Sequence, residues 1–263
     1  MNVEKIQKSL ESKTRRWWFF LLFVLLQFVP PYASKGIEWS EIEAFSLEIL
    51  SKSFMSSCAV LYPLFKIIPI LLVISILFLK NRTARLFAVY AGVNYVLFAF
   101  FLCVAVTEKY GLGILIGNFL LFLIIASFWF WEARAGKNDF TPRKIPAWRY
   151  WVIPFAFLAF WYPVNPHTFT PDFNPLHFIT NEAGLLFCMM TPVFLAILTL
   201  YYPKVNIATM RVTSLVGVIV GFWNMYASFI SNPDLLWWNG VLHIPLFTIS
   251  IYSLILSYKG KPS

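Results

Sequence analysis

Charged residues are scarce in this sequence: Asp, Glu, Lys and Arg together make up 13% of its 263 residues. Soluble globular chains carry about 25% charged residues, so an ordinary soluble domain is excluded. Acidic residues are the scarcest, with 12 Asp and Glu against 21 Lys and Arg. Apolar residues take their place, since 59% of the chain is hydrophobic and 19% aromatic, and the mean hydropathy is +0.70. The composition predicts an integral membrane protein.

Cysteine and histidine are also rare, with three of each. Cys58, Cys103 and Cys188 show neither metal-type spacing nor a disulfide framework, so we interpret them as small buried apolar residues. The chain has no HExxH zinc motif and no ATP-binding loop. This lack of a catalytic signature favours a protein that is not an enzyme, and it indicates no particular cofactor. ATP-driven work would require a separate ATPase chain or other membrane subunits.

Long apolar runs recur along the whole chain, with short polar breaks between them. Lipid offers backbone groups no hydrogen-bond partner, so each run is expected to be a helix, and about 20 residues cross a hydrocarbon core of roughly 30 Å. We expect one membrane domain, residues 1–263, folded as an all-α polytopic helical bundle. Its eight predicted spans are residues 17–29, 57–79, 86–106, 112–131, 150–163, 184–202, 212–230 and 241–258. The first and fifth are short, and one re-entrant segment would make the count seven.

Basic residues gather in alternate breaks between these spans. Seventeen of the 21 Lys and Arg lie in the two terminal tails, the turns 80–85 and 204–211, and the loop 134–149, whereas Lys35, Lys52 and Lys109 lie on the other side. Cytoplasmic loops are enriched in Lys and Arg, so we predict cytoplasmic termini in a bacterial or archaeal cell membrane. The net charge of +9 is then a topology signal. We expect the lipid bilayer as a partner, and no nucleic acid.

The two halves of the chain share a sequence frame. An Arg, a Trp and a Pro of the first span recur in the fifth at one common offset of 133 residues: Arg16, Trp18 and Pro30 against Arg149, Trp151 and Pro163. Two units of four spans each would point the same way, as a parallel repeat of residues 1–140 and 141–263. The alternative is that these residue types recur at membrane boundaries in any such protein.

Lys66 lies in the middle of the apolar run "LYPLFKIIPILL", residues 61–72. Nine residues from the start of its span, at 1.5 Å each, put it about 14 Å deep, near the middle of the bilayer. A charge there costs roughly 2.5 to 3.5 kcal/mol and usually faces a cavity or pairs with an acid. No Asp or Glu is expected at the same depth, which leaves a bound anion or a neutral lysine. The alternative is an amine bonded to backbone carbonyls freed by Pro69.

Three further amides, Asn94, Asn118 and Asn224, lie inside predicted spans, where each must find a partner. They either join helices or line a polar pathway. We predict that the Lys66 amine points toward them from the floor of a cavity, and we treat these four residues as candidate substrate-binding residues. Residues 37–54 are predicted to form an amphipathic helix on the outer leaflet, because their apolar residues recur at helical spacing.

All three histidines are predicted to lie on the outer side, near two carboxylates of the loop 165–182. His and carboxylate groups that converge at a helix mouth can bind Zn²⁺ or Cu²⁺ or relay protons. The alternative is that they are interfacial hydrogen-bonding residues. The candidate metal ligands are His167, His177, His243, Asp172 and Glu182.

The second half carries "CMMTPVFLAILTL", "RVTSLVGVIVGFWN" and "NPDLLWW". These segments resemble an uncharacterised family of bacterial multi-pass membrane proteins with a Cys-Pro-Thr-Thr-type motif, which is here Cys188-Met-Met-Thr191-Pro192. The resemblance implies a multi-pass membrane fold and no particular activity.

Three functions are compatible with these features. The tandem halves, the mid-membrane lysine and the membrane amides favour a small-molecule or ion transporter, or a membrane subunit of a transport complex. The outer histidines and carboxylates would fit an intramembrane enzyme or a metal or redox protein. A non-catalytic assembly or immunity-type membrane protein would need no small-molecule site.

Overall fold

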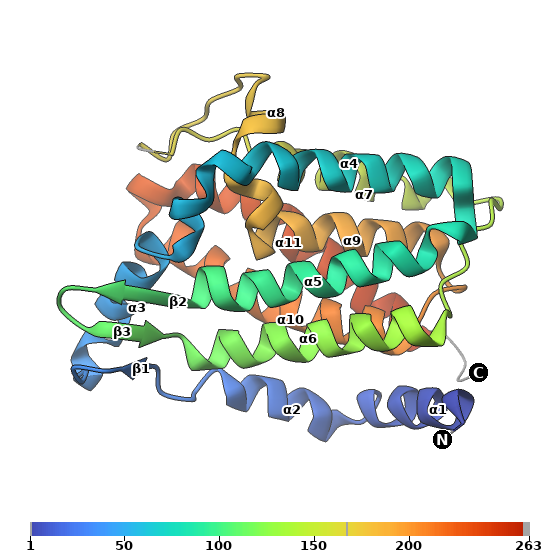
Figure 1. Ribbon diagram of the computed structural model, residues 1–263, viewed down its shortest axis with the longest axis horizontal. Coiled ribbons are helices and arrows are strands. Elements are labelled where there is room, and N and C mark those ends of the chain that lie inside the picture. The colour runs from blue at the N-terminus through green and yellow to red at the C-terminus, as the bar shows by residue number, and fades with distance from the viewer. Residues whose placement is uncertain (1, 167, 260–263) are drawn as a thin grey trace.

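Apolar helices lying side by side make up most of the computed structural model, which describes residues 2–166 and 168–259 (Figure 1). The helices are α1 (Val3–Thr14), α2 (Trp17–Leu26), α3 (Ile42–Ser51), α4 (Tyr62–Leu79), α5 (Ala84–Cys103), α6 (Ile116–Ala135), α7 (Val152–Trp161), α8 (His177–Thr180), α9 (Phe187–Tyr201), α10 (Ile207–Tyr226) and α11 (Pro233–Lys259). Short helical turns are η1 (Trp39–Glu41), η2 (Phe54–Leu61), η3 (Lys80–Arg82), η4 (Ala147–Arg149), η5 (Glu182–Leu185) and η6 (Ala227–Ser231). The all-helical prediction is confirmed.

Five helical segments are long and apolar enough to cross a membrane: Cys58–Arg82, Ala84–Cys103, Ile116–Ala135, Ile207–Ser231 and Pro233–Lys259. A sixth candidate is the pair His177–Leu185 and Phe187–Tyr201, which is bent by 94° at a short break. At 1.5 Å per residue, a 20-residue helix is about 30 Å long, the thickness of the hydrocarbon core. These lengths support a membrane protein.

The predicted count of eight spans is not confirmed. Each predicted span contains a helix, but α2 and α7 in the first and fifth spans have ten residues each, or about 15 Å of length. α7 ends because Tyr162 adopts a left-handed conformation with φ of 54° and a proline follows it. α2 ends at Leu26. The chain then passes Pro30 and Pro31, which cannot continue a helix, and enters strand β1.

A small sheet replaces the ends of two predicted spans. Strands β1 (Tyr32–Ala33), β2 (Val104–Thr107) and β3 (Gly111–Ile114) form an antiparallel sheet in the order β1-β3-β2, with Val104 opposite Ile114. The third and fourth predicted spans therefore extend too far, to residue 106 and from residue 112. Three of the four residues of β2 are β-branched, and such residues favour an extended backbone.

Helix α3 covers this sheet. The amphipathic helix expected within residues 37–54 is present, and its buried residues are Phe45 and Ile49. Both side chains contact Gly113, where an added Cβ would lie 2.3 Å from the Ile49 side chain. Phe45 and Ile49 of α3 therefore pack on the hairpin, whereas Leu47 and Leu50 of the same helix are exposed. Its place on the outer leaflet stays a prediction.

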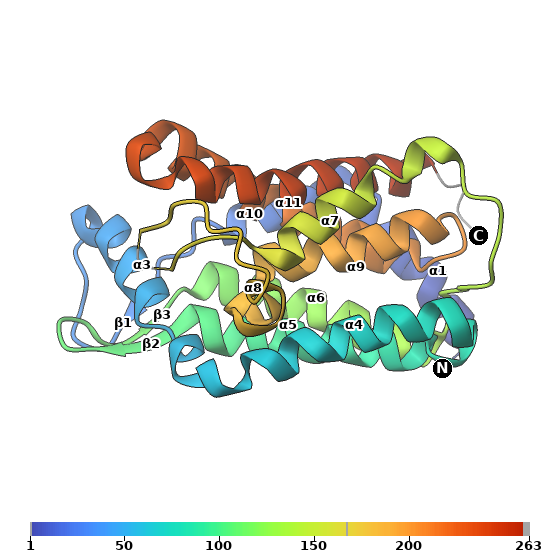
Figure 2. The same ribbon diagram turned by 90° about the horizontal axis from the view of Figure 1, so that it is seen from above.

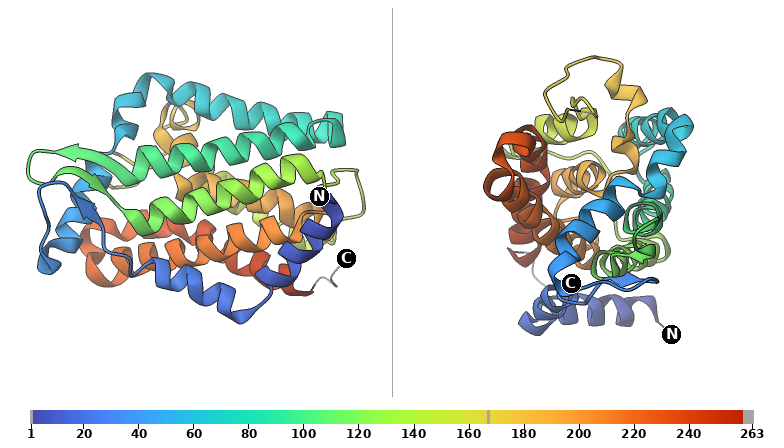
Figure 3. Two further views of the ribbon diagram at one scale, coloured as in Figure 1. Left: turned by 60° about the horizontal axis from the view of Figure 1, so that its bottom comes forward. Right: turned by 90° about the vertical axis from the view of Figure 1, so that its left-hand side faces the viewer.

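The two ends of the bundle differ in charge. The end that we call the basic end holds α1, the Lys80–Arg82 turn, the loop 136–149 and the last described residue, Lys259, whereas the sheet and α3 form the opposite end (Figures 1 and 3). Both ends of the described chain therefore lie at the same end of the bundle. The basic loops that were predicted to share one side do share it.

Helix α9 occupies the centre of the bundle, between α4, α5 and α6 on one side and α10 and α11 on the other (Figures 2 and 3). Eleven of its 15 residues are buried, whereas only four of the 18 residues of α4 are buried. The parallel repeat would place α4 and α9 in equivalent positions. Their environments differ, so the structure does not confirm the repeat of residues 1–140 and 141–263.

Candidate functional site

Lys66 is fully buried on α4 and faces the end of α7. Its Nζ donates a hydrogen bond to the backbone carbonyl of Phe160 and lies 4.2 Å from the centroid of the Phe160 ring. Phe160 belongs to the last turn of α7, where carbonyls have no partner within the helix. Because the C-terminal end of a helix carries partial negative charge, a lysine stabilises it. Lys66 therefore caps α7.

Asn181 caps the next two carbonyls of the same helix end. Its Nδ2 donates to the carbonyls of Trp161 and Tyr162 over 2.8 and 2.9 Å, and its Oδ1 accepts from the backbone N–H of Ala183. The segment between α8 and α9 thus folds back onto α7. Lys66 and Asn181, which come from separate parts of the sequence, thus donate hydrogen bonds to the carbonyls at the end of α7.

Glu182 supplies a negative charge near Lys66. It begins the η5 turn, which packs so closely on α4 that a Cβ on Gly184 would lie 2.4 Å from the carbonyl oxygen of Phe65. The charge of Glu182 acts on the Lys66 amine and on the hydroxyl of Tyr62. The sequence gives no sign of an acid at the depth of Lys66, but the 94° bend before α9 brings η5 and Glu182 to α4.

The predicted contacts between Lys66 and the membrane amides are wrong, since its described partners are the carbonyl and ring of Phe160. Asn94 is fully buried on α5; its amide and the hydroxyl of Tyr90 interact weakly, but neither completes a hydrogen bond of normal geometry within the described residues. Asn224 donates to the carbonyl of Val220 over 2.9 Å, within its own helix, and contacts the Cys188 sulfur at 3.8 Å. The amides are therefore distributed over separate helix contacts.

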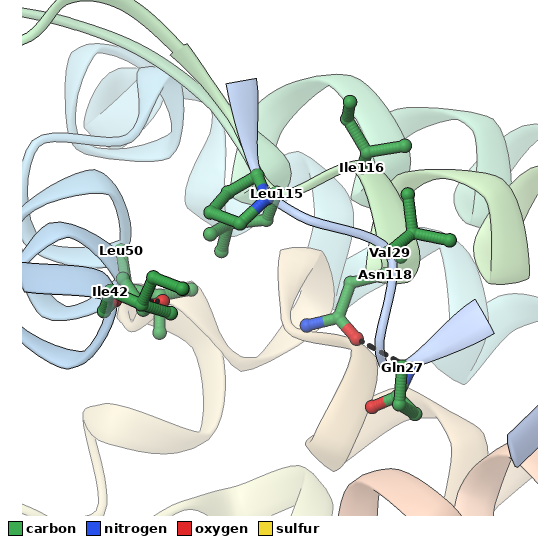
Figure 4. A pocket seen from close by; sticks show the side chains of 10 residues that line it. Gln27, Val29, Ile42, Leu50, Leu115, Ile116 and Asn118 are labelled. Carbon is green, nitrogen blue, oxygen red and sulfur yellow. Dashed lines mark hydrogen bonds between the residues drawn. The ribbon is translucent and has the colours of Figure 1, made fainter. Parts of the chain in front are cut away.

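Asn118 lines a cavity of about 180 Å³ near the sheet end (Figure 4). Its Oδ1 accepts a hydrogen bond from Gln27 over 3.4 Å. The walls come from the chain after α2, from α3 and from the start of α6, and they are Gln27, Val29, Pro31, Ile42, Ser46, Leu50, Leu115, Ile116, Gly117 and Asn118. This cavity has apolar walls with two amides at one side.

The described outer histidines do not gather at one site. His177, the first residue of α8, pairs with Asp172 of the preceding loop: His177 Nε2 and Asp172 Oδ2 lie 2.9 Å apart, and this hydrogen bond lowers the pKa of Asp172. His243 is buried on α11, where its Nδ1 donates to the carbonyl of Asn239 over 2.7 Å.

No group of three or more His, Cys, Asp or Glu side chains that could hold a metal ion occurs among residues 2–166 and 168–259. His167 lies outside the described residues. The described members of the predicted metal set thus serve local hydrogen bonds or, in the case of Glu182, lie near Lys66. The three cysteines are free.

Comparisons of the chain with protein-family models, curated proteins and solved structures found no match. The resemblance of the second half to a multi-pass membrane family stays a prediction.

Proposed function

We propose that the protein is a membrane transporter for a small ion or molecule, or the membrane subunit of a transport complex, with its substrate-contacting centre at Lys66. The observation that carries this proposal is a fully buried lysine at the meeting point of two interrupted helical segments, the end of α7 and the bend before α9. Non-helical backbone at membrane depth is tolerated where it is buried in protein or lines a cavity. In transporters, such breaks commonly form the binding site.

The charges at this centre favour a small anion as the first substrate class to test. The Lys66 amine donates to a neutral carbonyl, and an anion is a stronger acceptor that can compete with this carbonyl for the same donor. Asn181 and Tyr62 supply polar groups close by. In this proposal, α2 and α7 complete a set of eight membrane segments and both termini are cytoplasmic. The energy source would be an ion gradient or a separate ATPase subunit.

The alternatives receive less support. An intramembrane enzyme or metal protein would need the outer histidines and carboxylates to converge, and no three of the described ones do. A non-catalytic assembly or immunity-type protein would leave Lys66 as a helix cap alone.

Cysteine accessibility distinguishes a transport centre from a helix cap. In liposomes, a Lys66→Cys variant that lacks the three native cysteines should react with a water-soluble methanethiosulfonate reagent, because a substrate path must admit water. Ile67→Cys is the matched control: this neighbouring position is 43% exposed on the apolar surface of α4, so in lipid it should not react. If Lys66→Cys is as unreactive as Ile67→Cys, Lys66 only caps α7.

A Lys66→Met variant provides the functional test. It should fold, since an apolar chain of similar length replaces a buried charge. Proteoliposomes that contain chloride, phosphate or acetate should lose the flux of the transported ion in this variant. Unchanged flux of every ion carried by the wild type would contradict a role for Lys66 in transport.

A further inference from the structure

Two arginines at the basic end lie against the aromatic residues that end α9. The Arg149 guanidinium donates to the carbonyl of Tyr202 over 2.6 Å and lies 5.2 Å from the Tyr202 ring and 5.4 Å from the Trp148 ring. The Arg143 guanidinium lies 6.0 Å from the ring of Tyr201. Cation–π contacts of this kind hold guanidinium groups in place without neutralising their charge.

Both guanidinium groups keep unused donors. Arg143 Nη2 and Arg149 Nε are buried and complete no hydrogen bond of normal geometry within the part of the chain that the structure describes, although the Tyr252 hydroxyl interacts with the Arg149 side chain. Neither arginine belongs to any of the three ion pairs found among those residues. A buried N–H without an acceptor is destabilising, and more so when it is charged, so these donors favour an acceptor from outside the chain.

Asp139, an acid near Arg143, does not accept these unused arginine donors. Asp139 is bonded to Lys204 over 3.1 Å and to Asn81 over 2.8 Å, and it also accepts from Thr141. Burial lowers the pKa of Arg143; the charge of Asp139 opposes this effect, and the charge of Arg149 adds to it. Two like charges close together, each with an unused buried donor, make a site for an anion with several acceptor oxygens.

We propose that Arg143 and Arg149 bind the phosphate group of an anionic phospholipid. The site lies at the end of a bundle of membrane-length helices, where headgroups are found. Trp148 and Tyr150 beside it are 58% and 45% exposed, and such aromatic residues are typical of the membrane interface. Ile153 and Phe157, exposed on α7, offer an apolar surface for the acyl chains below the headgroup. Basic pockets of this type recognise lipid headgroups.

Native mass spectrometry of the full chain in detergent measures this binding. The wild type should bind phosphatidylglycerol at least about tenfold more tightly than phosphatidylcholine, the change expected for about 1.4 kcal/mol of charge-assisted hydrogen bonding. The preference should disappear in Arg143→Gln/Arg149→Gln. Lys137→Gln/Lys144→Gln removes the same charge from exposed positions of the same segment and should keep most of the preference.

Three results would overturn the proposal. They are equal binding of the two lipids by the wild type, equal loss in both double variants, and binding of inorganic phosphate as tight as binding of phosphatidylglycerol. Because Arg149 also holds Tyr202, Arg149→Lys serves as a second variant. It keeps the charge but loses the planar fork of donors, so its lipid preference should fall while its melting temperature in phosphatidylcholine stays close to that of the wild type.

Discussion

The side-chain amide of Gln7 donates a hydrogen bond to Asn206 Oδ1 over 3.0 Å and joins the first helix of the chain to the start of α10. The same amide donates to Glu11, and its oxygen accepts from the indole N–H of Trp131 over 2.7 Å. Asn206 in turn donates to the carboxylate of Glu132 over 2.7 Å. These buried groups attach a polar, surface-type helix firmly to the apolar bundle.

Replacement of Gln7 by alanine should therefore lower the stability of the whole protein. It removes one buried partner of Asn206 and the acceptor of the Trp131 indole, and such losses cost about 1 to 3 kcal/mol each. The melting temperature in detergent should fall by several degrees. Lys8→Ala, at an exposed position of the same helix, should leave it unchanged. Equal effects of the two substitutions would show that α1 is not attached through Gln7.

Gly184→Ala should disturb the contact between η5 and α4. The new Cβ would lie 2.4 Å from the carbonyl oxygen of Phe65 and 2.7 Å from its carbonyl carbon, and backbone atoms cannot rotate away. Overpacking of this kind costs about 1 to 3 kcal/mol. The control is Gly92→Ala, where the three atoms nearest to the new methyl all belong to the ring of Phe130, a partly exposed side chain that can move. Thermal unfolding should separate the two variants, and a stable Gly184→Ala would contradict this close packing.

Asp139 should make stability depend on pH in the acid range. Hydrogen bonds from Thr141 and Asn81, with that from Lys204, hold the pKa of Asp139 well below its ordinary value. A carboxyl with a depressed folded-state pKa adds stability above its unfolded pKa of about 3.9, and this contribution is lost as the pH falls toward the folded value. Between about pH 5 and pH 3, the melting temperature of the wild type should therefore fall more than that of Asp139→Asn. Parallel curves for the two proteins would rule out this role.

The charge difference between the two ends of the bundle predicts topology. Lys35 and Lys137 are both exposed. Lys35 follows β1 at the sheet end, and Lys137 follows α6 at the basic end. Single-cysteine variants at these positions, without the native cysteines, should react with an impermeant maleimide from opposite sides of the membrane, with residue 137 on the cytoplasmic side. Labelling of both from the same side would show that the bundle axis does not cross the bilayer.

The fold class could be predicted from the sequence because apolar run length is a local property. Every predicted span contains a helix, and the burial of Lys66 follows from its place in an apolar run. The β-branched residues of the hairpin 104–114 favour strands. They lie at the ends of long apolar runs, however, and the length of those runs predicts helices. The ends of α2 and α7 were harder to predict, since their hydrophobic runs continue past the last helical residue.

The partners of Lys66 could not be predicted because they depend on distant backbone. Its acceptor is a main-chain carbonyl 94 residues away, and no residue type marks such a group. Glu182 and Asn181 stand together in "ITNEAG", a segment poor in helix-forming residues. That segment can indicate an interruption of the helix, but it cannot indicate which other helix the interrupted backbone will contact. Sequence patterns report which side chains are costly to bury, whereas their partners follow from three-dimensional packing.

The short length of α2 also affects the lipid around it. Most of its side chains face outward, including Leu21, Leu22 and Leu25, yet its ten residues extend only about 15 Å along the axis. The end of α2 lies beside the start of α6, where Gln27 bonds Asn118. At its other end, α2 begins after Arg15 and Arg16, where α6 still has apolar turns to run as far as Trp131, which contacts α1 through Gln7. Lipid chains beside α2 must shorten or tilt to match this step. The protein therefore presents a thin flank to the bilayer, and lipids with short acyl chains should accumulate there.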